Sequence, residues 1–121
     1  MGMRDLSLFF AALADENRLR LLYLMKEGEI CVCYLQGVLQ TNQPKISRHL
    51  AYLKKAGLAE ARREGKWMHY HLKRLEAHLE KILSDTLDHL QKEPQIKKDA
   101  QRLKQIVCRP ERYGISAFQQ K

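Results

Sequence analysis

Hydrophobic residues recur every three or four positions along most of this chain, a pattern that predicts a mainly helical protein. Residues 5–14 form the first such stretch, and cap residues at 15–17 predict that a second helix follows. Further helices are predicted over 29–40 and over 75–92, the latter with a wide leucine stripe. A sixth helix is marked by Ile96, Ala100, Leu103 and Val107.

The stretch 43–56 and the residues after it carry the most informative pattern. One side of this predicted helix is apolar, and the opposite side is polar and basic. The apolar side consists of Ile46, Leu50 and Leu53. Gly57 closes the helix, and the period then changes to that of two short strands, 58–63 and 66–72. A helix, a tight turn, a basic helix and a hairpin make a winged helix-turn-helix, so we predict a mostly α fold with a small β-hairpin.

Positive charge is concentrated in the same segment. The chain has 121 residues, with 22 Lys and Arg against 14 Asp and Glu, and a net charge of +8. Residues 41–75 hold nine of the basic side chains and two of the acidic ones, so most of the surplus lies there. A localised surplus predicts a polyanion as the partner. Length and a hydrophobic fraction of 45% predict one domain over 1–107, followed by a polar tail at 108–121.

Double-stranded DNA is the polyanion that this arrangement favours. The second helix of such a motif enters the major groove, where polar side chains contact base edges. Its outward face offers Gln43, Ser47, Arg48 and Tyr52. Phosphates beside the groove are the expected partners of Lys45, Lys54, Lys55, Arg62, Arg63 and Lys66. The first set would specify the sequence and the second would position the protein.

Two other classes of protein are not expected. The longest apolar run is 8–14, far short of the roughly 18 to 20 residues that span a bilayer. The N-terminus also lacks the layout of a signal peptide, so we expect a cytoplasmic protein with no membrane partner. The sequence contains no Ser, His and acid arrangement, no glycine-rich phosphate loop and no His-Glu-x-x-His motif, so we expect no enzyme.

Three cysteines supply the candidate chemistry. Cys31 and Cys33 lie one residue apart, where a disulfide between them would be strained, and Cys108 is the odd third. In a reducing cytoplasm such thiols are free to bind soft metals or to act as redox sensors. Buried structural cysteine is the alternative interpretation.

Four motifs, in order and spacing, resemble the arsenic-responsive repressors of the ArsR family. They are GEICVC at 28–33, QPKISRHL at 43–50, AGL at 56–58 and GKWMHY at 65–70. The resemblance extends over about 8–72 and implies a repressor that leaves its operator when As(III) or Sb(III) binds. It also implies a DNA-reading helix and an inducer site. The reading helix would carry Gln43, Lys45, Ser47, Arg48 and His49, and the inducer ligands would be Cys31 and Cys33.

A homodimer is expected on two grounds. The resemblance implies that the first and the fifth helix pair with those of a second subunit. Independently, Phe9, Phe10 and the leucine stripe at 75–92 exceed what a small core needs, and a dimer interface would bury them. No cofactor is expected beyond the inducer.

The ligand set raises a geometric question. As(III) prefers three thiolates, and in a regular helix residues two apart lie about 200 degrees apart around the axis. One ion can therefore bind both Cys31 and Cys33 only if the first turn of the helix at 29–40 opens or is not fully helical to begin with, and we expect binding to deform this helix. Some relatives carry a third cysteine where this chain has Gln36, so Cys108, from the same or from the second subunit, is our candidate for the third ligand. A small-molecule thiol and a two-thiolate site remain alternatives, and the latter would also accept a methylated arsenical.

Two rival inducers stay open. Glu76, His78 and His89 follow a spacing like that of zinc-sensing relatives, with Asp85 between the two histidines and on the same helix. However, Lys92 stands where those relatives have a further ligand. A cadmium- or zinc-responsive repressor is therefore one alternative. A repressor that releases DNA when Cys31 or Cys33 is oxidised is the other.

Overall fold

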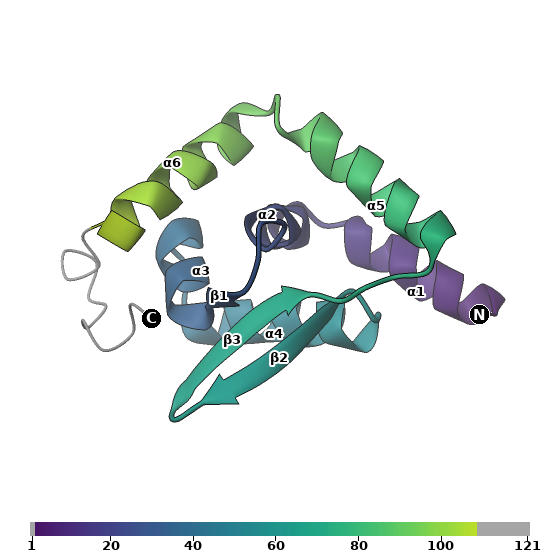
Figure 1. The fold of residues 1–121 in the computed structure, drawn as a ribbon, viewed down its shortest axis with the longest axis horizontal. Helices are drawn as coiled ribbons and strands as arrows, with labels where there is room; N and C mark the ends of the chain where they lie inside the picture. Colours follow the sequence, from purple (N-terminus) through teal and green to yellow (C-terminus); the bar gives the residue numbers. More distant parts are fainter. Residues whose placement is uncertain (1, 109–121) are drawn as a thin grey trace.

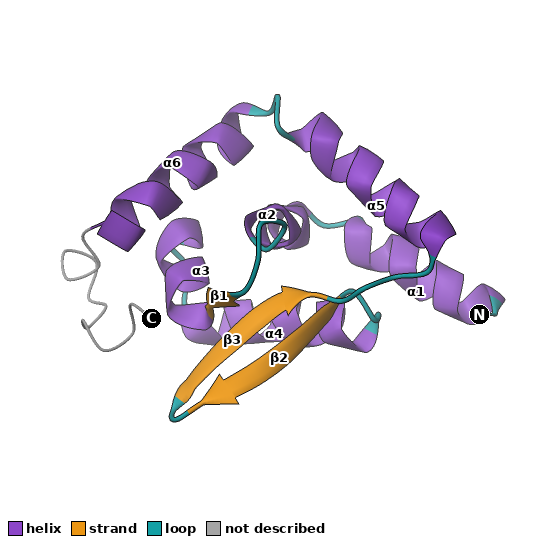
Figure 2. Ribbon diagram, viewed as in Figure 1, coloured by secondary structure: helices purple, strands orange, loops and turns teal. Residues whose placement is uncertain are grey.

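Six helices and three strands follow one another in a computed structural model, which describes residues 2–108 except for the side chain of Cys108 (Figures 1 and 2). They are α1 (Met3–Leu13), α2 (Glu16–Leu24), β1 (Ile30–Cys31), α3 (Val32–Leu39), α4 (Gln43–Lys55), β2 (Ala59–Glu64), β3 (Trp67–Leu72), α5 (Ala77–Leu90) and α6 (Pro94–Cys108). The predicted mostly α fold with a hairpin is confirmed. The tail expected at 108–121 lies outside the described residues, apart from the last position of α6. None of the helices described is long and apolar enough to cross a membrane.

Local sequence signals set the ends of α4. The Asn42 side chain accepts a hydrogen bond from the backbone N–H of Lys45 at 3.0 Å, and Pro44 occupies the first turn, where its missing N–H costs nothing. The three predicted apolar residues are all buried, so they fix which side of α4 faces outward. The chain then leaves through Gly57, whose φ of +81° is one that glycine adopts without strain.

The hairpin is the predicted one, but the sheet has a third strand. β2 and β3 pair antiparallel with Glu64 opposite Trp67, and β1 pairs with the other edge of β3, giving the order β1-β3-β2. In β1, Cys31 lies opposite His69. The helix predicted to start at residue 29 therefore begins only at Val32. The prediction failed there because the backbone of Ile30 and Cys31 hydrogen-bonds to a strand nearly forty residues away, which local periodicity does not report.

The leucine stripe of α5 is buried within the chain itself. Leu79, Leu83 and Leu87 are at most 4% exposed, and Phe9 of α1 is 1% exposed. In Figure 1, α5 and α6 meet at a bend and run along one side of the molecule, with α2 between them and the hairpin. The expectation that the whole stripe awaits a partner was therefore wrong. Phe10, 48% exposed, remains uncovered.

Helix α6 is held to α2 by a buried ion pair that the sequence pattern did not indicate. Asp99 is 2% exposed and accepts hydrogen bonds from Arg20 Nε at 2.8 Å and Arg20 Nη2 at 2.9 Å. Gln95 Nε2 donates a third at 2.9 Å. The buried side of α6 consists of Ile96, Asp99 and Ile106, whereas Val107, expected on the apolar stripe, is 51% exposed.

Removal of Asp99 tests this attachment. Asp99→Ala leaves the Arg20 guanidinium without its buried partner, so we expect the free energy of unfolding to fall by about 3 kcal/mol. Asp85→Ala is the matched control, because its 3.0 Å contact with Lys81 is exposed and we expect a change within about 0.5 kcal/mol. Urea denaturation at one fixed protein concentration measures both. Equal losses in the two variants would contradict the assignment.

Candidate DNA-reading surface and thiol site

The outward face of α4 presents most of the residues that the sequence predicted. Gln43, Lys45, Ser47 and Arg48 are all exposed, while the opposite side of the helix is fixed in the core. Gln43 and Lys45 lie in the first turn of the helix. The surface therefore combines hydrogen-bonding side chains with positive charge, as a helix entering the major groove requires.

Two further predicted residues of α4 are held toward the neighbouring helices. The Arg18 guanidinium lies 4.1 Å from the centre of the Tyr52 ring and donates hydrogen bonds to the carbonyl oxygens of Ala12 and Ala11 at 3.0 and 3.1 Å. His49 is half-buried, with Nδ1 3.9 Å from an Asp15 carboxylate oxygen. These contacts fix α4 against α1 and α2. His49 and Tyr52 therefore help to position the helix.

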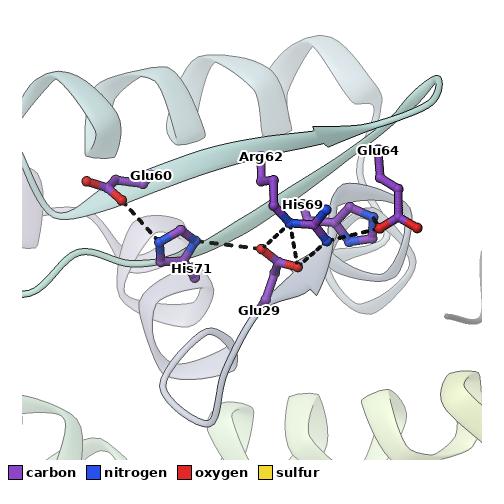
Figure 3. A network of polar contacts seen from close by, with 6 residues as sticks. All are labelled: Glu29, Glu60, Arg62, Glu64, His69 and His71. Carbon is purple, nitrogen blue, oxygen red and sulfur yellow. Dashed lines mark hydrogen bonds and ion pairs between the residues drawn. The ribbon is translucent and has the colours of Figure 1, made fainter.

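The basic residues of the hairpin divide between its two faces. Arg63 and Lys66 are exposed, and no hydrogen bond or ion pair to a described acidic residue is found for either. Arg62 points to the other face, because side chains alternate along a strand. There its Nη2 lies 2.6 Å from a Glu29 oxygen and 3.0 Å from a Glu64 oxygen (Figure 3). The positive charge of Arg62 is thus already compensated by two carboxylates, which sequence reasoning missed because Glu29 precedes it by 33 residues.

The two thiols of the inducer motif lie side by side. Cys31 Sγ and Cys33 Sγ are 2.7 Å apart, with Cys31 3% exposed and Cys33 half-buried. Cys31 is the extended residue before α3, with φ −70° and ψ 140°, and Cys33 is in the first helical turn. Because the pair is not within one regular helix, the 200-degree separation does not apply. Of the two alternatives, the first turn that is not fully helical is therefore confirmed, and α3 does not have to open to bring the sulfurs together.

Proximity also makes the two thiols chemically unequal. A hydrogen bond from Cys33 lowers the pKa of the Cys31 thiol to about 6, against the opposing effect of burial. The same hydrogen bond, together with burial and the adjacent negative charge, raises the pKa of the Cys33 thiol. The two groups therefore titrate as a pair that holds one proton and one negative charge near neutral pH. One sulfur is already a thiolate, the form that binds soft ions and reacts with electrophiles.

A pocket of about 220 Å³ joins the thiols to the reading helix and the hairpin. Its lining includes Cys31, Cys33, Gln36, Gln43, Ser47 and Trp67. Gln43 and Ser47 are thus shared between this pocket and the exposed face of α4. A second pocket, of about 250 Å³, lies on the other side of Cys31 and is lined by His69, Leu103 and Val107 among others.

The remaining candidate ligands are not gathered into a site. His78 and His89 are exposed on α5, and in the part of the chain that the structure describes no three His, Cys, Asp or Glu residues lie close enough to hold a metal ion. The zinc-type set with Glu76 and Asp85 is therefore not assembled within one described chain. The side chain of Cys108 lies outside the described residues. The two adjacent sulfurs of Cys31 and Cys33 are the assembled candidate.

Comparison with known proteins gives close relatives for the DNA-binding part of the chain. The family model for bacterial regulatory proteins of the arsR family matches residues 15–61. The arsenical resistance operon repressor of Escherichia coli K12 is 55% identical over 64 residues, which cover 52% of this chain and 55% of that protein. An uncharacterized HTH-type transcriptional regulator of Methanocaldococcus jannaschii, MJ1325, is 47% identical over 64 residues, covering 52% of this chain and 72% of that protein.

A solved structure agrees with the fold. The homodimeric winged helix-turn-helix DNA-binding domain of Mb0332 from Mycobacterium bovis, described as a possible ArsR-family transcriptional regulator, superposes with a TM-score of 0.64. It is 26% identical, over 76% of this chain and 83% of that one. The predicted winged helix-turn-helix is confirmed. The chain spans about half the length of the arsenical and arsenic resistance regulators that it matches.

The unequal thiols make a prediction about pH. Iodoacetamide reacts with thiolate, so alkylation of the peptide that contains Cys31 and Cys33 should rise as pH rises through about 6. Cys33→Ala removes the S–H donor, and we expect the midpoint to move up toward the ordinary thiol value of 9.0. Gln36→Ala, which alters the same pocket without removing a thiol, should keep the low midpoint. Mass spectrometry of the alkylated peptide measures all three, and a wild-type midpoint near 9.0 would refute the pairing.

Proposed function

Because the chain belongs to the ArsR family of bacterial regulatory proteins, we propose that it is a homodimeric repressor whose operator complex is broken by trivalent arsenic or antimony. Cys31 and Cys33 bind the inducer. The exposed face of α4 reads the operator, and the tip of the hairpin contacts the phosphates.

The pocket that the thiols share with α4 carries this proposal. Cys31 and Cys33 line it from one side, and Gln43 and Ser47 of the reading helix line it from the other. An ion held by the two sulfurs occupies a space whose wall is made by residues that contact bases in the complex. Bound inducer and bound operator therefore require different positions of the same side chains, Gln43 and Ser47. A 100-fold weakening, about 2.8 kcal/mol, takes an operator that is about 99% occupied to about half occupancy.

The chemistry of the pair suits arsenous acid. Each sulfur that bonds to arsenic displaces a hydroxyl group, which leaves as water after taking up a proton. Cys33 supplies one such proton and solvent supplies the other, because Cys31 is already largely ionised at neutral pH. Soft thiolate ligands favour As(III) and Sb(III) over hard cations. Both sulfurs lie within reach of one ion, since the two start 2.7 Å apart, and an ion that binds between them moves them apart.

Cys108 of the same subunit is our candidate for a third ligand. Helix α6 packs against α3, and Leu103 and Val107 from its last turns line the second pocket together with Cys31. Cys108 ends this helix and so follows directly on a residue that borders the pocket of Cys31. Gln36, which stands at the position of the third cysteine in some relatives, lines the first pocket and offers only an amide.

The dimer is supported by α1. Met3 is 88% and Phe10 48% exposed on this helix, and such apolar side chains are commonly buried between subunits. In a two-fold dimer the two reading helices must lie about 34 Å apart to enter successive major grooves on one side of DNA. A small displacement in each subunit then disturbs two contacts at once.

The direct test is operator release. A fluorescent duplex enriched from a random library by the wild-type protein serves as the probe, and fluorescence anisotropy follows its binding. Arsenite should release the duplex from wild type, but not from Cys31→Ser or Cys33→Ser. Cys108→Ser should weaken the response without abolishing it. Release that persists in both Cys31→Ser and Cys33→Ser would refute the inducer site, and release by Cd(II), Zn(II) or peroxide without arsenite would support the rival inducers.

The division of charge in the hairpin gives a second prediction. Arg63 has no acidic partner among the described residues, so Arg63→Ala should remove one phosphate contact and reduce the slope of log affinity against log salt by about 1. Arg62→Ala should change that slope by less than about half as much, because its charge is compensated by Glu29 and Glu64. Anisotropy titrations over a range of salt concentrations compare the two variants. A larger change in Arg62→Ala would show that its ion pairs open on DNA.

A further inference from the structure

The residue that leads into β1 is tied to the far strand of the hairpin. Glu29 directly precedes β1, and its carboxylate accepts hydrogen bonds from Arg62 Nε at 3.0 and 3.1 Å and from Arg62 Nη2 at 2.6 Å (Figure 3). Arg62 belongs to β2, which does not pair with β1, because β3 lies between them. The two side chains therefore reach across the central strand and connect the two edges of the sheet.

This contact joins the thiol site to the surface expected to bind phosphate. On one side, Glu29 is two residues from Cys31, which pairs with His69 of β3. On the other side, Arg62 is followed directly by Arg63, the exposed basic residue of β2. β1 contains only two residues, so its attachment to the hairpin by backbone pairing is short. A second contact, at 3.8 Å between Glu29 and His71 Nδ1, reaches only the middle strand.

We propose that Glu29 is a positioning residue that transmits the state of the thiols to the hairpin by holding Arg62. The proposal rests on the proposed function, since it concerns how inducer binding reaches the DNA contacts. When Cys31 moves to accommodate the inducer, Glu29 moves with it, and the bidentate hold on Arg62 carries the displacement to β2. The hairpin then changes its position relative to α4, and the phosphate contact at Arg63 no longer matches the base contacts.

The contact between Glu29 and Arg62 is not expected to be important for the stability of the fold. The side chains of Arg62 and Glu29 are 49% and 32% exposed, and exposed ion pairs contribute little to stability. Loss of the contact should therefore leave the fold almost unchanged, and any gain in DNA affinity from the uncompensated charge of Arg62 should be the same in Glu29→Ala and Glu64→Ala. Glu64 offers a matched comparison, because it bonds the same arginine at 3.0 Å but lies in the same strand. Its removal takes away the same charge without cutting the link between β1 and β2.

The experiment compares Glu29→Ala with Glu64→Ala by anisotropy with the selected duplex. Arsenite should weaken duplex binding by about 100-fold in wild type and Glu64→Ala, but by less than about tenfold in Glu29→Ala. Arsenite affinity without DNA, followed by protection of the thiols from alkylation, should stay within about twofold of wild type in both variants. If arsenite weakens duplex binding in Glu29→Ala by the same factor as in wild type, the proposal is overturned. Loss of arsenite binding in Glu29→Ala would also overturn it, by placing Glu29 in the thiol site.

A second readout separates this proposal from the choice of inducer. If the contact between Glu29 and Arg62 couples the hairpin to the thiols, a duplex that fixes the hairpin should slow alkylation of the peptide containing Cys31 and Cys33 without any metalloid present. We expect about fivefold slowing or more in wild type and Glu64→Ala, and less than about twofold in Glu29→Ala. If arsenite does not release the duplex from the wild-type protein, the proposed inducer is refuted, but the role of Glu29 is not. Equal slowing in all three proteins, or none in wild type, would refute the role of Glu29.

Discussion

The pairing of two backbone residues, Ile30 and Cys31, with the edge of β3 is the constraint on which the rest of the site depends. It holds Cys31 extended, so that its sulfur meets that of Cys33 from the following helical turn. It also brings the thiols against the hairpin rather than leaving them on a free helix. The thiol pair is consequently assembled between α4 and the sheet, beside a pocket lined by residues of both.

Charge in the hairpin is arranged by the alternation of side chains along its strands. Glu60, Arg62 and Glu64 share one face of β2 and lie opposite His71, His69 and Trp67. On this face acidic residues neutralise the arginine, while Arg63 projects from the other. The net positive charge of the segment therefore does not indicate which side chains meet DNA. Partners from distant parts of the chain decide that, and Glu29 is the clearest case.

The interactions that connect elements are those with no local signal. Arg20 and Asp99 are 79 residues apart, yet their hydrogen bonds fix α6 on α2 and so bring the end of α6 toward Cys31. Arg18 likewise supports Tyr52 of the reading helix through a stacking contact. The helical periodicity of the sequence marks each of these residues only as polar and does not indicate its partner. Only the assembled structure shows that polar positions, and not the apolar stripe alone, set how the helices are oriented.

The sequence by itself determined the helices, the hairpin, the exposed basic face of α4 and the cysteine pair, because periodicity, caps and spacing act within a few residues along the chain. Tertiary structure alone decided that residues 30 and 31 form a strand, that the two sulfurs already touch, and that α5 is covered within its own chain. It also decided which arginine of the hairpin has acidic partners among the described residues and which has none. These outcomes depend on contacts between residues far apart in sequence, whose energies no local pattern contains.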